Sequence, residues 1–181
     1  MNNNQTVEKL KHMRLTAMAD LHLQHVKNNK FNELTPDEYL ALLADHECED
    51  RQNKKISRLL NQASFRQKAS TAELNYAQPR NLDKNMFNRL ATLDFITKKE
   101  NIILTGASGE GKSYLGQALG SQACLMGYRV FYTNTARLLS MLKLSKVDGT
   151  YIRELKKLSK VELLMMDDFG LQPLIHMPER L

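Results

Sequence analysis

The chain has 181 residues, of which 42% are hydrophobic and 25% charged, and its formal net charge is +6. This balance excludes a disordered or collagen-like chain, and no apolar run approaches the ~18 residues that a membrane span needs. Residues 1–5 lack the basic and apolar parts of a secretory signal, so we expect a cytoplasmic protein of one domain plus an appendage. Two distant cysteines, Cys48 and Cys124, indicate neither a disulfide framework nor a zinc site.

Amphipathic helices are predicted for the N-terminal third. Apolar residues recur at steps of three and four from residue 6 to about 27, as in a helix that packs on a partner. Thr35, Pro36 and Glu38 then supply the hydroxyl cap, the first-turn proline and the acidic third position of a second helix. This helix is expected to run to about Ser64. Its middle, residues 45–55, is too polar for a core and is interpreted as solvent-facing.

Positive charge gathers along and just after this second helix. Between residues 51 and 71 there are six basic side chains and no acidic one. The cluster suits a surface that faces a polyanion such as DNA, and a solvated helix face is an equally good interpretation. A second basic group, between residues 143 and 160, favours a solvated helix face. The predicted DNA contacts are Arg51, Lys54, Lys55, Arg58, Arg66 and Lys68.

The residue pattern changes after the second predicted helix. Residues 69–84 have the composition of a linker, with a boundary near residue 75, and residues 86–96 predict a short helix. From Asn101 onward, short apolar runs alternate with helical stretches, which indicates an α/β fold with a parallel sheet covered on both faces. The predicted strands lie at 102–104, 129–133 and 161–166, and the predicted helices at 112–126, 136–144 and 151–159.

Residues 106–113, GASGEGKS, match the P-loop pattern GxxxxGK[ST] at every fixed position. Glycines let backbone N–H groups converge on phosphate oxygens, and the helix that follows directs its positive end to the same point. A glycine-rich helix entry without a ligand is the alternative, and the flanking strand and helix disfavour it. The predicted nucleotide-binding residues are Gly106, Ala107, Ser108, Gly109, Glu110, Gly111, Lys112 and Ser113.

Four apolar residues and two carboxylates, Asp167 and Asp168, end the last apolar run. By itself such an ending fits a purely structural strand as well as a functional one. It lies, however, about 55 residues after the P-loop, where P-loop ATPases have their Walker B motif. With ATP and Mg²⁺ as the predicted cofactors, Lys112 is expected to reach the β and γ phosphates and Ser113 to bind the metal ion. Asp167 is expected to hold Mg²⁺ through its water shell, and Asp168 to polarise the attacking water.

Together with residues 10–19 and 34–43, these motifs resemble the IstB-like transposition helper ATPases of bacterial insertion sequences. These proteins are relatives of the DnaC-type helicase loaders within the AAA+ ATPases. The resemblance implies a three-layer α/β P-loop core and ATP-dependent assembly of a homo-oligomer on duplex DNA, which recruits the transposase. The P-loop and Walker B motifs are shared with many ATPases, so the N-terminal helices are the family-specific part.

The resemblance ends after Leu174, and only 13 residues follow Asp168. The family core continues with a sensor strand, placed between the P-loop strand and the Walker B strand, and with an arginine finger. We therefore expect a C-terminally incomplete copy with unpaired strand edges, and ATP hydrolysis is left open. The predicted domains are an N-terminal helical domain for DNA or partner binding (1–75), a linker with a lead-in helix (76–100) and a partial ATPase core (101–181).

Two alternatives remain open. A DnaC-like helicase loader would use the same nucleotide site and hold a replicative helicase through its N-terminal helices. A non-catalytic interaction module would bind a partner through residues 6–64 and carry an inert ATPase remnant. The identity of the partner separates the first alternative from a transposition helper, and nucleotide titration tests the second.

Overall fold

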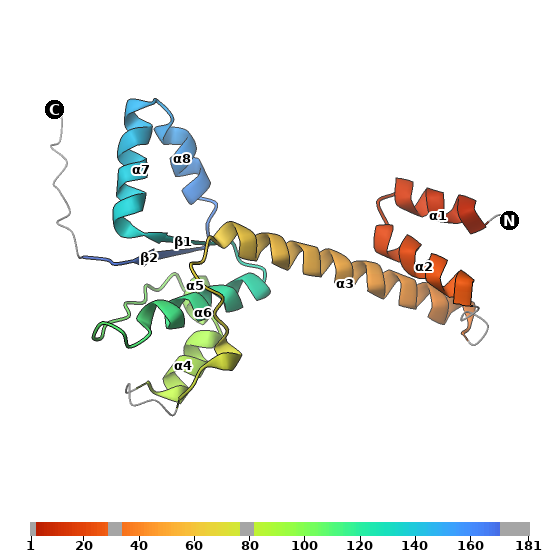
Figure 1. Ribbon diagram of the computed structural model, residues 1–181, viewed down its shortest axis with the longest axis horizontal. Helices are drawn as coiled ribbons and strands as arrows, with labels where there is room; N and C mark the ends of the chain where they lie inside the picture. The colour runs from red at the N-terminus through yellow and green to blue at the C-terminus, as the bar shows by residue number, and fades with distance from the viewer. Residues whose placement is uncertain (1–2, 29–33, 77–81, 171–181) are drawn as a thin grey trace. The chain divides into compact units, whose positions relative to one another are not determined.

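The computed structural model describes residues 3–28, 34–76 and 82–170. The chain forms two compact units, residues 1–57 and 58–181. Figure 1 shows the helices and strands of both. The predicted linker residues 77–81 and the predicted departure from the family pattern after Leu174 lie outside the described residues. Among the described residues, no helix is long and apolar enough to cross a membrane.

The first unit begins with two helices, α1 (Asn3–His12) and α2 (Thr16–Asn28), so the prediction of one helix over residues 6–27 is wrong. The chain turns at Arg14, whose φ of 62° is left-handed. The Leu15 N–H donates to the Leu10 carbonyl at 2.9 Å and the Arg14 N–H to the Lys11 carbonyl at 2.9 Å, which satisfies carbonyls at the end of α1. Apolar residues continue at helical spacing on both sides of this turn because α1 packs against α2, and Val7 and Ala17 are buried.

The third helix, α3 (Pro36–Ala63), confirms the predicted start and end. Thr35 and Glu38 form a capping box, in which the Glu38 carboxylate accepts from the Thr35 N–H at 2.8 Å and from its hydroxyl at 2.7 Å. Ser64 follows the helix with a left-handed φ of 61°. The cap explains why the helix begins where the sequence places it.

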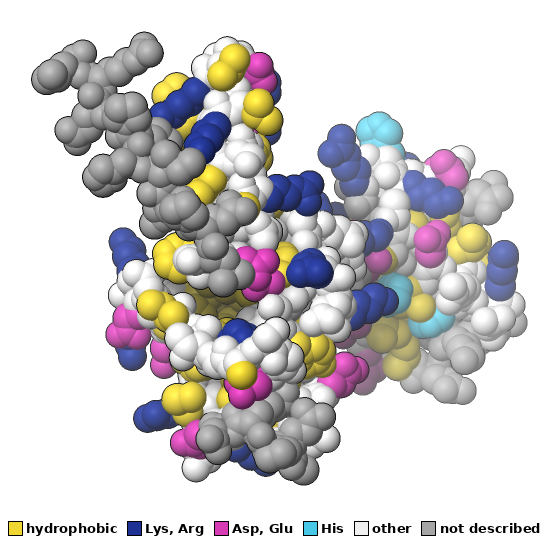
Figure 2. Space-filling model, turned by 60° about the vertical axis from the view of Figure 1, so that its left-hand side comes forward, with side chains coloured by type: hydrophobic (Ala, Val, Ile, Leu, Met, Phe, Trp, Pro, Cys, Tyr) yellow, Lys and Arg dark blue, Asp and Glu magenta, His cyan; other side chains and the backbone are white. Residues whose placement is uncertain are grey.

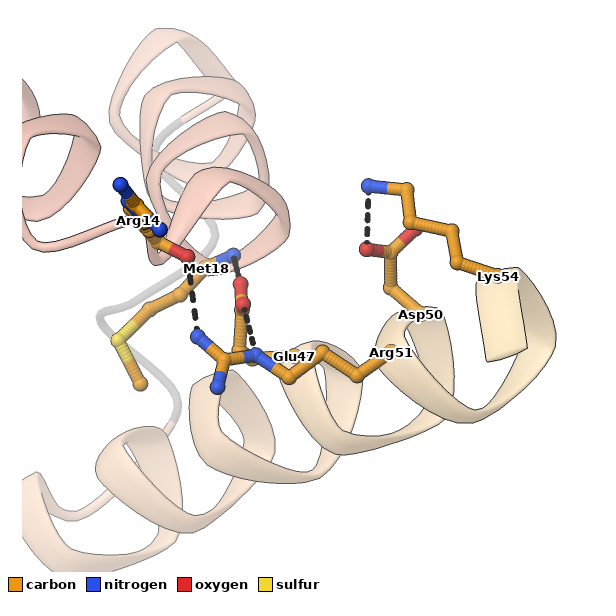
Figure 3. Close-up of polar contacts among 6 residues, drawn as sticks. All are labelled: Arg14, Met18, Glu47, Asp50, Arg51 and Lys54. Carbon is orange, nitrogen blue, oxygen red and sulfur yellow. Dashed lines mark hydrogen bonds and ion pairs between the residues drawn. The ribbon is translucent and has the colours of Figure 1, made fainter. Parts of the chain in front are cut away.

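A buried carboxylate, Glu47, lies in the middle of α3, so the interpretation of residues 45–55 as wholly solvent-facing is wrong at this position. Glu47 accepts from the Met18 N–H at 3.1 Å, in the first turn of α2, and from the Arg51 guanidinium at 2.8 Å. Arg51 also donates to the Arg14 carbonyl at 3.0 Å (Figure 3). Because its polar atoms have partners, Glu47 is buried without the cost of an unpaired charge.

The second unit is built around two parallel strands, β1 (Val130–Asn134) and β2 (Leu163–Asp167). They pair in register from Val130 opposite Leu163 to Asn134 opposite Asp167. Helix α6 (Lys112–Leu125) packs on one side of the pair, and α7 (Thr135–Val147) with α8 (Tyr151–Leu158) lies on the other (Figure 1). The remaining elements are η2 (Thr71–Glu73), α4 (Lys84–Ala91) and α5 (Asp94–Thr97).

Two hydrophobic clusters support α6. One joins the end of α3, through Leu59 and Ala63, to residues of α5, α6 and β1. The other contains Leu74 and Phe87 beside Leu115 and Leu119 of α6. Part of the predicted linker therefore packs against the core, and the predicted short helix over 86–96 is divided between α4 and α5 by Leu93, whose φ is 64°.

The predicted strand at residues 102–104 is absent, and this is the main correction to the fold. Residues 101–107 have no regular structure, and Ile103 is 78% exposed. A strand needs a partner for its backbone groups, and in the described part of the chain the only ladder joins β1 to β2. The sheet is also not covered throughout, since Leu164 and Met166 of β2 are 41% and 42% exposed.

Candidate nucleotide-binding site

The loop of residues 106–111 leads directly into the N-terminus of α6. Gly109 and Gly111 have φ values of 86° and 83°, in the left-handed region that favours glycine. Gly111 is the residue that caps α6, and no side chain bonds to the first amides of the helix there. The first amides of α6 thus have no side-chain acceptor, which suits an anion at this end of the helix.

Two charged side chains of the loop fold back onto Ala107. The Lys112 ammonium donates to the Ala107 carbonyl at 2.5 Å, and the Ala107 N–H donates to the Glu110 carboxylate at 2.9 Å. These two bonds hold Ala107, Glu110 and Lys112 together within the loop. The loop is solvent-exposed up to Glu110, and Lys112 and Ser113 are half-buried.

Asp167 connects the end of β2 to the beginning of α6. Its carboxylate accepts from the Ser113 hydroxyl at 3.0 Å and from the Tyr132 hydroxyl of β1 at 2.5 Å. The Asp168 N–H donates to the same carboxylate at 3.1 Å, and the Thr135 hydroxyl donates to the Asp167 carbonyl at 2.8 Å. The structure thus brings two residues of the predicted site, Ser113 and Asp167, into direct contact across 54 positions of sequence.

These contacts favour the charged form of Asp167. Burial by itself raises the pKa of this carboxyl, but the hydrogen bonds from Tyr132 and Ser113 outweigh it and hold the pKa below its usual value. For Tyr132, burial and then the bond to Asp167 raise the pKa to about 12, against a smaller opposite effect of Arg66. At neutral pH the site contains a carboxylate and a protonated phenol.

Asp168 lies just past the strand end with a left-handed φ of 54°. Its carboxylate accepts from the Asn134 amide at 2.6 Å. The other end of that amide caps α7 by accepting from the N–H groups of Ala136 and Arg137, at 2.9 and 3.3 Å. One asparagine therefore fixes the start of α7 and orients the second carboxylate of the site.

Three residues of this arrangement were missed by sequence reasoning. Tyr132 and Asn134 stand two positions apart on β1, so they point to the same side of the strand, and this alternation is a signal that could have found them. Gln117, only 1% exposed, donates to the Ser113 carbonyl at 3.0 Å and accepts from the Arg66 and Gln67 N–H groups at 2.8 and 3.2 Å. No local signal marks Gln117, because the two N–H groups that it accepts from lie 51 and 50 positions away in the sequence.

The oxygen atoms brought together here fit Mg²⁺. A serine hydroxyl and a carboxylate are hard oxygen ligands, the type that Mg²⁺ takes together with water and substrate phosphates. Within residues 3–28, 34–76 and 82–170, no group of three or more His, Cys, Asp or Glu side chains is placed to hold a metal ion. A magnesium ion at Ser113 and Asp167 would complete its shell with water and phosphate oxygens.

The six predicted DNA contacts differ in their surroundings. Arg51 is engaged by Glu47, and Lys54 is paired with Asp50 at 2.7 Å (Figure 3). Arg66 is one of the groups that act on Tyr132 and Asp167, so it lies beside the nucleotide site. The side chains of Lys55, Arg58 and Lys68 are exposed.

The second basic group lies on α7, α8 and the turn that follows. Figure 2 shows Lys and Arg side chains next to exposed hydrophobic ones on this hairpin. The exposed hydrophobic residues include Leu144, Val147 and Ile152, at 64%, 84% and 61%. Lys157 is paired with Glu154 at 2.8 Å, as expected for a solvated helix face.

The sequence is similar to ATP-binding proteins of insertion sequences. The sequence matches the family of the IstB-like ATP binding protein over residues 8–180, so the match continues past Leu174, where a departure from the family pattern was predicted. A protein of Sinorhizobium fredii named as an insertion sequence ATP-binding protein is 37% identical, with 93% of this chain and 69% of the relative covered. A protein of Pseudomonas fluorescens named as an ATP-binding protein of insertion sequence IS1162 is 37% identical, with 96% and 76% covered.

Proposed function

Since the chain belongs to the family of IstB-like ATP binding proteins, as its motifs predicted, we propose that it binds ATP with Mg²⁺ at residues 106–113. The observation that carries this proposal is the 3.0 Å contact between the Ser113 hydroxyl and the Asp167 carboxylate. It joins the first turn of the helix after the P-loop to the carboxyl end of β2. Ligands of open α/β sheets bind at this edge.

Each residue then has a role that its position supports. The loop amides and the N-terminus of α6 receive the phosphates, and Lys112 leaves the Ala107 carbonyl to reach the β and γ phosphates. Ser113 and Asp167 hold the magnesium ion, which neutralises phosphate charge when it is bound. The Tyr132 hydroxyl keeps Asp167 charged and oriented.

Hydrolysis is assigned to Asp168. Its carboxylate stands beside Asp167 and is oriented by the Asn134 amide, so it can accept a proton from a water that attacks the γ phosphate. Aspartate is one methylene shorter than the glutamate that many P-loop ATPases carry here. We therefore propose that the protein hydrolyses ATP slowly and that another subunit supplies the arginine finger.

The relatives are named for insertion sequences, and this context suggests what ATP binding serves. We propose that the protein is a cytoplasmic helper of transposition, which assembles as a homo-oligomer on DNA in an ATP-dependent way and recruits the transposase. The exposed bases Lys55, Arg58 and Lys68 support the DNA part, because contacts to the phosphate backbone give affinity independent of sequence.

Titration of the full chain with Mg-ATP tests the nucleotide site. Isothermal titration calorimetry of the wild type and of Lys112→Ala is expected to show binding for the first and none for the second. Lys156→Ala, which removes an exposed lysine of α8, is the matched control and should bind as the wild type does. Equal binding by the wild type and Lys112→Ala would contradict the assignment of the P-loop.

Affinity capture tests the cellular role. The tagged protein with Mg-ATP and duplex DNA is expected to retain a transposase. Capture of a hexameric replicative helicase instead would overturn the proposal in favour of a helicase loader. If the wild type binds no nucleotide at all, a non-catalytic interaction module is the better account.

A further inference from the structure

An acidic side chain of the loop occupies part of the loop's own hydrogen-bonding capacity. Oε2 of Glu110 lies 2.9 Å from the Ala107 nitrogen, whose N–H it accepts, while the Lys112 ammonium is bonded to the carbonyl of the same residue. The N–H and the carbonyl of Ala107 are thus both bonded to charged side chains, which lie three and five positions later in the sequence. The loop already contains an anion.

The first glycine of the motif makes room for this carboxylate. A Cβ atom at Gly106 would lie closer to Oε2 of Glu110 than real Cβ contacts come. The carboxylate therefore fills the space that any other residue at this position would need for its side chain. Glu110 is solvent-exposed, so the charge-assisted bond to Ala107 is what keeps a flexible side chain folded over the loop.

On the basis of the proposed function above, we propose that Glu110 determines the affinity of this site by competing with the phosphates of the nucleotide for the loop. A bound triphosphate brings several negative charges to the loop. Either the Glu110 carboxylate swings away and loses its bond to Ala107, or it stays and repels the phosphates. Both routes weaken binding, and the pattern GxxxxGK[ST] does not require an acid at this position.

The experiment compares wild type, Glu110→Gln and Glu100→Gln by calorimetric titration of the full chain with Mg-ATP and, separately, with Mg-tripolyphosphate. Gln has the shape of Glu and can still accept from Ala107, but it lacks the charge. Glu110→Gln is expected to bind both ligands about tenfold more tightly. Glu100→Gln removes the same charge at an exposed position just before the loop and should match the wild type.

The outcomes separate the inference from the function on which it rests. If Lys112→Ala abolishes binding while Glu110→Gln binds no more tightly than wild type, the inference is overturned and the nucleotide site stands. If the wild type and all variants bind neither ligand, the proposed function falls and the inference with it. A tighter affinity for ATP alone, without the same gain for tripolyphosphate, also overturns the inference, because the competition concerns phosphate.

A second variant tests the contact in the nucleotide-free protein. Glu110→Ala removes the acceptor of the Ala107 N–H, so the ¹H–¹⁵N resonance of that amide in alanine-labelled protein is expected to move upfield. An unchanged resonance would overturn the contact. Circular dichroism checks that both variants keep the fold.

Discussion

Glu47 in the first unit and Asp167 in the second are both carboxylates tied to a neighbouring helix by hydrogen bonds. Glu47 binds a backbone N–H in the first turn of α2, and Asp167 binds the hydroxyl of Ser113 in the first turn of α6. Burial opposes ionisation in both cases, and hydrogen bonds nonetheless keep the pKa of each carboxyl below its usual value. The two residues are alike in their hydrogen bonds to a neighbouring helix and in their ionisation.

They differ in what balances the charge. Glu47 has a guanidinium 2.8 Å away, so its charge is neutralised within the first unit. The direct partners of Asp167 are two hydroxyl groups and a backbone amide, which are neutral, and the charge of Arg66 has the smallest effect on it. A carboxylate oriented by neutral donors keeps its attraction for a cation. This difference separates a residue that holds helices together from one that can hold a metal ion.

The largest effect is expected where that uncompensated charge is removed. Asp167→Asn keeps the shape and an acceptor for Ser113, but it should weaken binding of Mg-ATP about 100-fold, or about 2.7 kcal/mol. Calorimetry with Mg²⁺ and with EDTA measures the change. Asp148→Asn, at an exposed position after α7, is the control. Equal Mg-ATP affinity in Asp167→Asn and wild type would contradict the contrast between the two carboxylates.

Glu47→Ala is expected to act on stability instead. It leaves the Met18 N–H without its acceptor and leaves Arg51 only the Arg14 carbonyl, so the free energy of unfolding should fall by about 2–3 kcal/mol. Urea denaturation followed by circular dichroism measures the loss. Glu49→Ala, an exposed position on the same helix, should change stability by less than about 0.5 kcal/mol. The affinity for Mg-ATP should stay unchanged in both variants.

Acid should reduce the contribution of Glu47. Because its pKa is lower in the folded than in the unfolded chain, ionised Glu47 stabilises the protein above the ordinary value of 4.5, and this stability is lost as pH falls through the lowered value. The difference in unfolding free energy between wild type and Glu47→Gln should thus be constant near neutrality and shrink below about pH 4.5. A difference that grows in acid would show that the folded pKa is raised.

Sequence reasoning succeeded where the signal is local. The α/β P-loop fold class is confirmed by the family match, and the capping box at Thr35 and the helix after Gly111 lie where they were predicted. The P-loop residues 106–113 and the carboxylates Asp167 and Asp168 were predicted from their motifs, and their roles remain predictions. These signals depend on residues within a few positions of one another.

The features that the sequence did not predict depend on partners far along the chain. Arg14 ends α1 although no glycine or proline marks the turn, because the packing of α1 on α2 compensates for the left-handed residue. Residues 102–104 have the composition of a strand, but a strand also needs a neighbour with a free edge in register. Tyr132 and Asp167 are 35 positions apart, so only the fold shows that one orients the other.

The smallest predicted effect applies the same contrast to two neighbouring lysines of α3. Lys54 is paired with Asp50 at 2.7 Å (Figure 3). The Asp50 carboxylate therefore offsets the positive charge that Lys54 would present to a DNA phosphate. Lys55 is exposed. If α3 contacts DNA, Lys55→Gln should weaken binding to duplex DNA about fivefold at 0.15 M salt and lower the salt slope by about 1. Lys54→Gln should have a smaller effect on affinity and leave the salt slope unchanged, because the ammonium that it removes is bonded to Asp50. Fluorescence anisotropy over a range of salt concentrations measures both quantities. Equal losses in the two variants would show that Asp50 does not shield its partner, and no loss in either would restrict the DNA contact to other basic residues.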